Sequence, residues 1–557
     1  TATVPVRILA LNDFHGRIPA GRLYEKRPIG GAGVVAAYLR DAVSEQPERT
    51  LIVAAGDNVG ASPLPSALLM DEPTIMFFNM LGNSQCQIAQ RLAPRCNVVA
   101  TPGNHEFDRG VDEMLRLYGG GNSAQGPYLQ NPWLGSNFPL ISANLVWADS
   151  GKPVLPPYII KTVPYRNAQG QERELPIAFI GATTRDTPNI VKPSGTDKVR
   201  FLDEAEAINR YIPEIQAKGI HAIVAVIHEG GQQATYSGTT DASKPTVDGA
   251  IVEIIKRLDD EVDVVTSAHT HAFGNALIPA RGGKPVLLTQ ALNYGTAMAD
   301  IQLEIDPSRD EIVSKRAEIR YLWADAGPGL KPVLEASALA EQAVKRVSTI
   351  TERPVARIES DILSDANDDG ESPLGSLVAD TQRLASGADI AFINNGGLRE
   401  SLRWQKPAGS HLANGTITFG DAYAVQPFQN SLIRMRLSGE QLYQLLNQQF
   451  DRRDGEPTFL HGSGLSFSWD GRRGVGDKVV EIQVGGKAVD RKASYSVVVN
   501  NFLAEGGDSF TVFKQGRERT ILGGDLDAFL DYAAALTAKQ QALKAPELGK
   551  RAKRLDS

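Results

Sequence analysis

Short runs of apolar, mostly β-branched residues recur through the N-terminal part of the chain, and each run stops abruptly at polar residues. Runs of this kind are typical of strands that are buried on both faces of a sheet. Stretches of helical length separate several of them, for example residues 33–44 and 204–217. The pattern predicts an α/β layered domain, with strands at residues 6–12, 51–55, 98–101, 177–180, 223–227, 262–266 and 286–289.

The pattern changes near residue 327, where Gly and Pro residues precede a stretch with the apolar spacing of a helix, residues 333–347. We interpret this stretch as part of a linker helix with one buried face. The chain is therefore expected to divide into a first domain over residues 1–326, a linker helix over residues 327–352 and a second domain over residues 353–557.

The second domain has the mixed pattern of an α+β fold. Ser372 as N-cap and Pro373 at the first helical position predict the start of a helix. Short strands, a helix near residues 440–449 and strands up to residues 495–499 follow. At the end of the domain we expect an amphipathic helix over residues 526–543 and a solvated charged tail over residues 544–557.

Composition excludes some classes of protein. No apolar run approaches the roughly 18 to 20 residues needed to cross a bilayer, so no transmembrane segment is expected. The formal net charge of −7 argues against a surface that binds a nucleic-acid polymer. An anionic substrate must then be held locally, by metal ions or a few arginines.

The first residue is Thr1, and neither a basic stretch nor an apolar signal segment follows it. The chain is therefore interpreted as a mature or trimmed product. Cys86 and Cys96 are the only cysteines. They could form a small disulfide loop in an oxidising compartment, or they could be two unpaired thiols.

Polar residues follow several of the predicted strands directly. Ligands in open α/β sheets gather beyond the carboxyl ends of the strands. Imidazole and carboxylate together are the ligands that zinc, manganese or iron prefer. The strand-end residues that carry such groups are Asp13, His15, Asp57, Asn104, His105, Asp108, His228, His269 and His271.

Each of these residues alone has an ordinary structural explanation. An Asp after a strand usually forms a turn, and a single His more often packs through hydrogen bonds than binds metal. Five separate strand ends with Asp, His or Asn are harder to explain in that way. The sequence therefore predicts a shared metal site.

The succession Asp-x-His, Gly-Asp-Asn, Gly-Asn-His-Glu, His and His-x-His over residues 13–271 resembles the calcineurin-like metallophosphoesterases. The resemblance implies an α/β/β/α sandwich with two divalent metal ions, zinc or manganese. It also implies that Asp13, His15 and His271 hold the first metal. Asn104, His228 and His269 would hold the second, with Asp57 bridging both. In such a site, metal-bound water attacks phosphorus in line.

The same resemblance implies a catalytic role for His105, which would stabilise the transition state or assist the leaving group. Asp108 would orient its ring. The alternative for Asp108 is a carboxylate at the start of a helix, where negative charge is favourable.

The second domain resembles the C-terminal domain of the 5'-nucleotidase family in three stretches, residues 394–399, 426–430 and 500–508. The resemblance implies that Phe428 and Phe502 sandwich the nucleobase. Stacking suits this task because every base has a π-face. The alternative is that both rings are core packing. Further substrate contacts implied by the resemblance are Asn394, Arg399, Asn430 and Asp508.

One stretch departs from the family pattern. Some family members have arginines just before the helix that opens the C-terminal domain, whereas residues 365–371 are acidic here, which puts a phosphate contact there in doubt. Residues 371–375 look more like relatives that open 2',3'-cyclic nucleotides. The stretch also matches the start of an EF-hand loop, but Ser376 occupies the twelfth position, so a solvated acidic loop is expected.

The sequence thus predicts an exported, periplasmic or secreted two-domain enzyme. Its predicted reaction is the release of phosphate from nucleoside 5'-monophosphates at two divalent metal ions. Three alternatives stay open: a 2',3'-cyclic nucleotide phosphodiesterase, a nucleotide-sugar or dinucleotide pyrophosphatase, and a non-catalytic binding module that keeps its metals for structure. The sequence gives no indication of oligomeric state.

Overall fold

The computed structural model describes residues 2–452 and 455–557, which form two compact units that meet between Arg346 and Val347. Each unit has its own sheets and its own hydrophobic core. The boundary between the units lies within helix α9 (Leu334–Thr351), in the stretch predicted as a linker helix.

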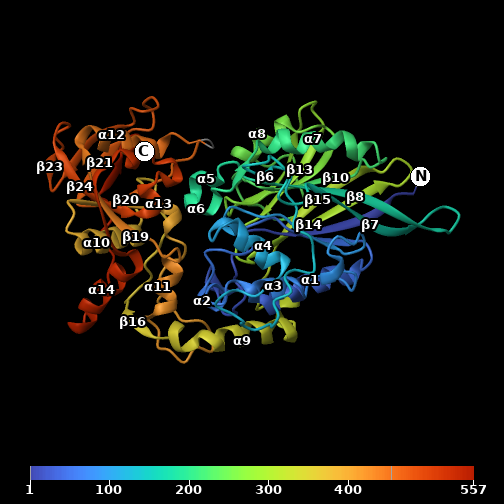
Figure 1. The fold of residues 1–557 in the computed structure, drawn as a ribbon, viewed down its shortest axis with the longest axis horizontal. Coiled ribbons are helices and arrows are strands. Elements are labelled where there is room, and N and C mark those ends of the chain that lie inside the picture. The colour runs from blue at the N-terminus through green and yellow to red at the C-terminus, as the bar shows by residue number, and fades with distance from the viewer. Residues whose placement is uncertain (1, 453–454) are drawn as a thin grey trace. The chain divides into compact units, whose positions relative to one another are not determined.

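The first unit contains two sheets that pack face to face (Figure 1). The five-stranded sheet has the order β15 (Glu311–Tyr321), β14 (Ala297–Asp306), β1 (Val4–Leu11), β4 (Thr50–Ala54) and β5 (Val98–Ala100). The six-stranded sheet has the order β12 (Phe273–Pro279), β13 (Pro285–Ala291), β11 (Val262–Thr266), β10 (Ile223–His228), β8 (Glu172–Thr183) and β7 (Tyr158–Arg166).

Helices cover the outer faces of these sheets. Helices α7 (Glu204–Gln216) and α8 (Ala250–Arg257) pack their isoleucines against the six-stranded sheet. Helices α1 (Ala32–Glu45), α3 (Glu72–Phe78) and α4 (Val111–Gly119) lie on the opposite side (Figure 1). The predicted α/β/β/α sandwich is therefore confirmed, and each predicted strand overlaps an observed one.

Parallel pairing brings the polar strand ends of each sheet to one edge. β1 is parallel to β4, and β4 is parallel to β5. In the other sheet, β10 is parallel to β11. Because the carboxyl ends of parallel strands share an edge, the loops that follow these strands lie close together.

The second unit has an α+β fold, as predicted. Its central sheet has the order β20 (Leu460–Ser463), β17 (Ile390–Asn394), β24 (Ser494–Asn500), β19 (Ser431–Ser438) and β25 (Arg517–Gly524). One face packs against α10 (Pro373–Ser386), α11 (Phe419–Val425) and α14 (Asp525–Ala538). The other packs against α12 (Gly439–Asn447), α13 (Asn501–Ala504) and the sheet β23 (Lys487–Ala488), β22 (Val479–Val484), β21 (Leu465–Trp469) and β26 (Ala552–Arg554).

The prediction of a solvated tail over residues 544–557 is wrong. β26 pairs with β21 in parallel, and the Arg551 guanidinium forms a paired contact with the Asp380 carboxylate at 2.8 and 3.0 Å. The buried Glu371 carboxylate accepts backbone N–H groups from Gly549 and Ala552 at 2.7 and 2.6 Å. The charges in this segment suggested exposure, but they are satisfied by partners far away in the sequence.

The acidic stretch is likewise more ordered than expected. The Asn367 side chain accepts the backbone N–H of Glu371 at 2.9 Å, and Asp369 accepts that of Arg554 at 2.8 Å. These oxygens therefore bind the protein's own backbone. Among the described residues, the groups of His, Cys, Asp and Glu side chains close enough to hold a metal lie elsewhere, in the first unit.

Cys86 and Cys96 form a disulfide. Within residues 2–452 and 455–557, the helices are all too short or too polar to cross a lipid bilayer.

Candidate dimetal active site

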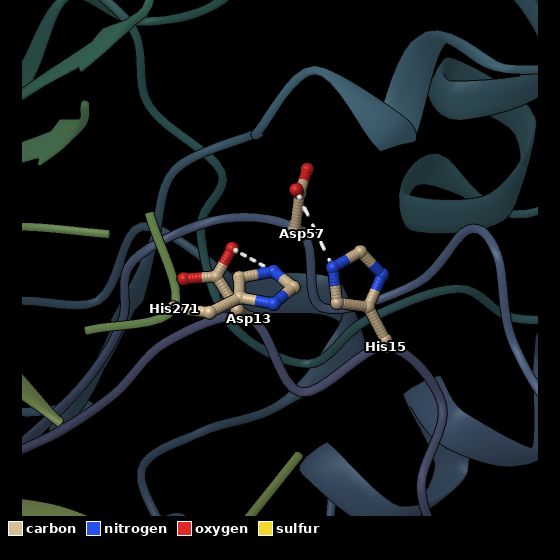
Figure 2. Close-up of side chains that lie close together, drawn as sticks. All are labelled: Asp13, His15, Asp57 and His271. Carbon is tan, nitrogen blue, oxygen red and sulfur yellow. Dashed lines mark ion pairs between the residues drawn. The ribbon is translucent and has the colours of Figure 1, made fainter. Parts of the chain in front are cut away.

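Four of the predicted ligands come together at the edge of the five-stranded sheet. The potential ligand atoms of Asp13, His15, Asp57 and His271 all lie within 4.8 Å of one another (Figure 2). His15 Nε2 is 3.5 Å from an Asp57 oxygen, and His271 Nε2 is 3.4 Å from an Asp13 oxygen. Asp13 and His15 follow β1, Asp57 follows β4, and His271 follows β11 of the other sheet.

A second group shares Asp57 with the first. Asp57, His228 and His269 also have ligand atoms within 4.8 Å of one another. His228 Nε2 is 3.2 Å from an Asp57 oxygen and 3.1 Å from Asn104 Oδ1. All seven predicted metal ligands thus surround two adjacent positions, and Asp57 is the residue common to both.

Backbone groups fix the orientation of the imidazole rings. His15 Nδ1 lies 2.7 Å from the carbonyl oxygen of Gly60, and His228 Nδ1 lies 2.8 Å from that of Ala55. Each ring therefore uses Nδ1 for the backbone and turns Nε2 toward the carboxylates. A hydrogen bond at one ring nitrogen commonly sets the tautomer and direction of a metal-binding His.

Five of these residues have left-handed backbone conformations, which non-glycine residues rarely adopt. The residues with φ between 49° and 78° are Asp13, His15, Asp57, His269 and His271. Each such conformation costs of order 1–3 kcal/mol and persists only where the surroundings enforce it. Strained backbone of this kind clusters at active sites and ligand sites, so its concentration here supports the hypothesis of a functional site.

The charges of the cluster depend strongly on one another. Burial opposes ionisation of Asp57, but His228, His105 and His15 hold its pKa well below the ordinary 3.8. Burial also opposes protonation of His228, yet Asp57 and Asp13 raise its pKa to about 10. A metal-binding imidazole must be neutral, so a divalent cation among these carboxylates would displace that proton.

The donor set fits divalent cations. Asp13 Oδ1 is buried and accepts no hydrogen bond from the described residues. Burying carboxylates without compensating positive charge is costly. The mixture of imidazole, carboxylate and amide oxygen is compatible with zinc or manganese.

His105 lies beside the cluster. Its ring centroid is 5.1 Å from that of His15, and its Nδ1 is 2.9 Å from an Asp108 oxygen. Its backbone N–H donates to Asp57 Oδ1 at 2.8 Å. His105 is absent from both ligand groups, and Asp108 occupies the position predicted for orienting its ring.

Glu106 is a site residue that the sequence analysis missed. Its buried carboxylate accepts backbone N–H groups from Asp57, Asn58 and Gly103 at 3.0, 2.9 and 2.6 Å. Burial and the nearby Asp57 charge raise the pKa of Glu106 to about 7. The residue joins the loops that follow β4 and β5. Its place in Gly-Asn-His-Glu was visible, but its backbone partners depend on the tertiary fold.

The predicted substrate residues lie in the second unit, at one end of its central sheet. β17 and β24 are parallel, and Leu432 of the antiparallel β19 pairs with Asn500. The loops with Asn394, Asn430 and Phe502 therefore emerge at the same end. Two of these loops are joined by a hydrogen bond of 2.9 Å, in which the Ser431 backbone N–H donates to Asn501 Oδ1.

Contacts between these loops bring further predicted residues together. Asn394 Nδ2 donates to Asp508 Oδ2 at 2.6 Å, and the Arg399 backbone N–H donates to the Val425 carbonyl at 2.9 Å. Phe428 and Phe502 are half-buried, so neither ring is fully enclosed in the core. Asn394 Oδ1 and Asn430 Oδ1 are buried without a hydrogen-bond partner among the described residues.

Comparisons with known proteins match both units. Residues 6–273 match the family model described as calcineurin-like phosphoesterase, and residues 347–515 match that of the 5'-nucleotidase C-terminal domain. The chain is 33% identical to the endonuclease YhcR of Bacillus subtilis, covering 95% of this chain and 39% of that protein. It is 30% identical to the cell wall protein Lmo0130 of Listeria monocytogenes, covering 99% and 69%, respectively.

Among solved structures, a 5'-nucleotidase precursor from Thermus thermophilus aligns over 100% of both chains, with a TM-score of 0.78 and 26% identity. The chain spans well under half of YhcR and about two thirds of Lmo0130.

Proposed function

Because the chain belongs to the family that joins a calcineurin-like phosphoesterase domain to a 5'-nucleotidase C-terminal domain, we propose that it releases phosphate from nucleoside 5'-monophosphates. The observation that carries this proposal is the convergence of two ligand groups on Asp57. Asp13, His15 and His271 complete one site, and Asn104, His228 and His269 complete the other. We propose zinc or manganese as the ions.

Two divalent cations held by these residues would lower the pKa of water and neutralise charge on the phosphoryl oxygens. The protein contributes orientation and proton transfer. Asp108 holds His105 through Nδ1, which leaves Nε2 as the atom that supplies a proton to the leaving oxygen or stabilises its charge. Glu106 keeps the loops of Asp57 and Asn104 in register.

The second unit supplies recognition of the nucleoside. Phe428 and Phe502 stack on the base, Asp508 accepts hydrogen bonds from the ribose, and Asn394 and Asn430 contact the base or sugar. Arg399 binds phosphate or orients the sugar, since its planar guanidinium forms paired hydrogen bonds. Half-burial of the two rings and the shared end of the sheet support these assignments.

Phosphodiester cleavage is the second candidate. It is favoured by the relative named as an endonuclease, and the same donor set suits a diester. Residues 371–375, which resemble relatives that open 2',3'-cyclic nucleotides, point in the same direction.

We also propose that the protein is exported. The Cys86–Cys96 disulfide supports this, because disulfides persist mainly in oxidising compartments.

The test is the identification of all products, inorganic phosphate and phosphomonoesters alike, formed by metal-stripped protein reconstituted with zinc or manganese. AMP, 2',3'-cyclic AMP, a UDP-sugar and single-stranded DNA are compared as substrates. Metal-dependent release from AMP, strongly reduced in a His105→Ala variant, is expected. Cleavage of diesters alone would replace the proposal with the second candidate. Turnover of none of these, with two ions bound, would favour a binding module.

A further inference from the structure

The two histidines of the His-Thr-His motif serve different ligand groups, although a single residue separates them. His271 belongs to the group that contains Asp13 (Figure 2), whereas His269 belongs to the group that contains His228. Both have left-handed backbone conformations, with φ of 78° at His269 and 56° at His271. Such conformations persist only where the surroundings enforce them. The turn therefore needs a constraint that holds the two rings at two different sites.

The side chain of Thr270, between the two histidines, is bound to two other segments. Its hydroxyl donates to the Gly231 carbonyl at 2.7 Å, and it accepts a hydrogen bond of 2.9 Å from Gln290 Nε2. The alternative acceptor for the hydroxyl proton, Gln290 Oε1, is farther away at 3.1 Å. Because a hydroxyl has one proton to donate and lone pairs to accept, the two shorter bonds can form at once. The hydroxyl therefore ties the turn to the loop after β10 and to β13.

Gln290 is a buried anchor for that hydroxyl. It lies on β13 and is 3% exposed. Its Nε2 also lies 3.3 Å from the Gly231 carbonyl oxygen, so one amide contacts both ends of the bond between Thr270 and Gly231. The neighbouring strand β12 makes room for the side chain at a glycine, because a Cβ atom on Gly274 would lie 3.3 Å from Gln290 Cβ. The position of the amide is therefore set by packing within the six-stranded sheet.

A second glycine allows the turn and the loop after β10 to approach each other. A Cβ atom on Gly230 would lie 2.1 Å from the Ala268 carbonyl oxygen and 2.4 Å from Thr270 Oγ1. Contacts that short do not occur in folded proteins, so a larger residue at this position would push the two segments apart. The loop that follows His228 therefore packs directly against the His-Thr-His turn.

We propose that Thr270 is a positioning residue for both metal ions. Its hydroxyl, held by Gln290, keeps the turn in the conformation that presents His269 to one ligand group and His271 to the other. The bond to the Gly231 carbonyl also fixes the turn relative to the loop that follows His228. A residue that orients metal ligands acts on affinity without touching the ion, and its loss commonly lowers metal affinity about 10–100-fold. This inference rests on the dimetal site of the proposed function.

The test compares Thr270→Val, which keeps the shape and removes the hydroxyl, with Thr270→Ser, which keeps the hydroxyl, and with Gln290→Met. Zinc and manganese binding to metal-stripped protein is measured by titration against a competing chelator. Thermal unfolding of the metal-free protein is recorded in parallel. Thr50→Val is the matched control, because the buried Thr50 hydroxyl donates to the Gln46 carbonyl at 2.7 Å at the start of β4, whereas Asp57 follows the end of that strand.

For Thr270→Val we expect the dissociation constants of both ions to rise about tenfold to hundredfold. Both should change because the two flanking histidines belong to different ligand groups. Thr270→Ser should bind both ions as the wild type does, since it retains the hydroxyl. Gln290→Met should show a smaller rise, because the bond from Thr270 to the Gly231 carbonyl remains. Thr50→Val should lower only the melting temperature of the metal-free protein.

Unchanged metal affinity in Thr270→Val, with a melting temperature lowered as in Thr50→Val, would overturn the inference and leave Thr270 a purely structural role. Weakening of one ion alone, or equal weakening in Thr270→Ser, would overturn it as well. If Thr270→Val does not fold, Gln290→Met decides, and unchanged affinity there counts against the inference. These measurements need no substrate, so a wild type that binds two ions but releases no phosphate from AMP would refute the proposed function alone.

Discussion

In the first unit the residues at the strand ends are charged and buried, whereas in the second they are neutral amides and half-buried aromatic rings. Asp13 and Asp57 are 0% and 1% exposed and surrounded by imidazoles. Asn394, by contrast, pairs with a single carboxylate, and Phe428 and Phe502 stay partly open. The two units have different topologies, but in both of them polar loops collect at one end of a sheet.

The difference in charge has energetic consequences. A buried carboxylate cluster is stable only with its full set of cations and protons, so removal of one member disturbs all the others. Neutral hydrogen bonds and stacking contribute separately and in smaller amounts. We therefore expect substitutions of the charged strand-end residues in the first unit to have large effects on turnover. Substitutions of the strand-end residues in the second unit should each have a smaller, separate effect.

The largest effect is expected for Asp57→Asn, because Asp57 belongs to both ligand groups. Turnover of AMP should fall by more than the about 10²–10³-fold that follows loss of one transition-state donor. Both metal ions should be retained poorly. Elemental analysis of the purified variant checks this, and two tightly bound ions per chain would show that Asp57 does not bridge them.

His105→Ala should cost about 10²–10⁴-fold in kcat, the range for loss of a general acid or base. Metal content should be unchanged, since His105 is outside both ligand groups. The matched variant Asp108→Asn removes only the orienting charge and should cost less. If both variants retain full activity while binding two ions, the catalytic assignment of this pair is wrong.

Phe428→Ala tests the second unit, where we expect a smaller effect than in the first. Loss of stacking should lower kcat/KM for AMP about tenfold to hundredfold, mainly through KM. Ribose 5-phosphate, which has no base, serves as the control substrate. An equal loss with both substrates would indicate that the ring supports the fold instead of the base.

Glu371→Gln should act on stability. It replaces a carboxylate that accepts several backbone N–H groups with an amide that places an NH2 against some of them. We expect the melting temperature of the second unit to fall by about 5 °C, since a loss of 1 kcal/mol corresponds to about 2–4 °C in a unit of this size. Calorimetry is the measurement, and a shift confined to the transition of the first unit would contradict the assignment.

The smallest effect is expected for Lys161→Met, a test of buried charge away from the active site. The Lys161 ammonium lies in the first unit and donates a hydrogen bond to the Ala93 carbonyl at 3.1 Å, and burial lowers its pKa from 10.5 to about 7. Between these pH values the unfolded chain binds a proton that the folded chain does not, so wild-type stability rises with pH.

Lys161→Met should therefore be stabilising at pH 7 and below, and its advantage should disappear by about pH 10.4, where the unfolded lysine also loses its proton. Because the Ala93 carbonyl loses its hydrogen-bond donor, we expect the melting temperature at pH 7 to rise by only about 2–4 °C. Unfolding measured from about pH 6 to pH 10 checks the slope, and a pH-independent difference between variant and wild type would argue against a buried titrating lysine.

Regular elements were largely predictable from the sequence. The strand expected at residues 262–266 has those bounds, and the helix expected at residues 204–217 ends one residue earlier. Such elements follow from local apolar periodicity, which residues near in sequence determine. The helix expected at residues 526–543 ends at Ala538. The apolar spacing continues past this residue although the backbone is no longer helical there, so the spacing alone overestimates the length of the helix.

The strand-end ligands were also predictable, since each follows its strand directly. Their supporting contacts were not. Gly60, Ala55 and the backbone partners of Glu106 take part through main-chain atoms, which leave no signature in side-chain identity. The contact between His461 and Asn395 spans 66 positions and depends on the order of strands in the sheet. The same holds for β26, whose charged sequence resembled a free tail.

The place of β26 in the second unit bears on how the chain folds during its synthesis. Domains generally fold as units, with the N-terminal one first. The first unit is one continuous stretch, so it can close while later residues are still being translated. In the second unit, the contacts of Glu371 and β21 with residues 549–556 can form only after those residues have left the ribosome. The unit that holds the candidate metal site is thus complete before the second unit.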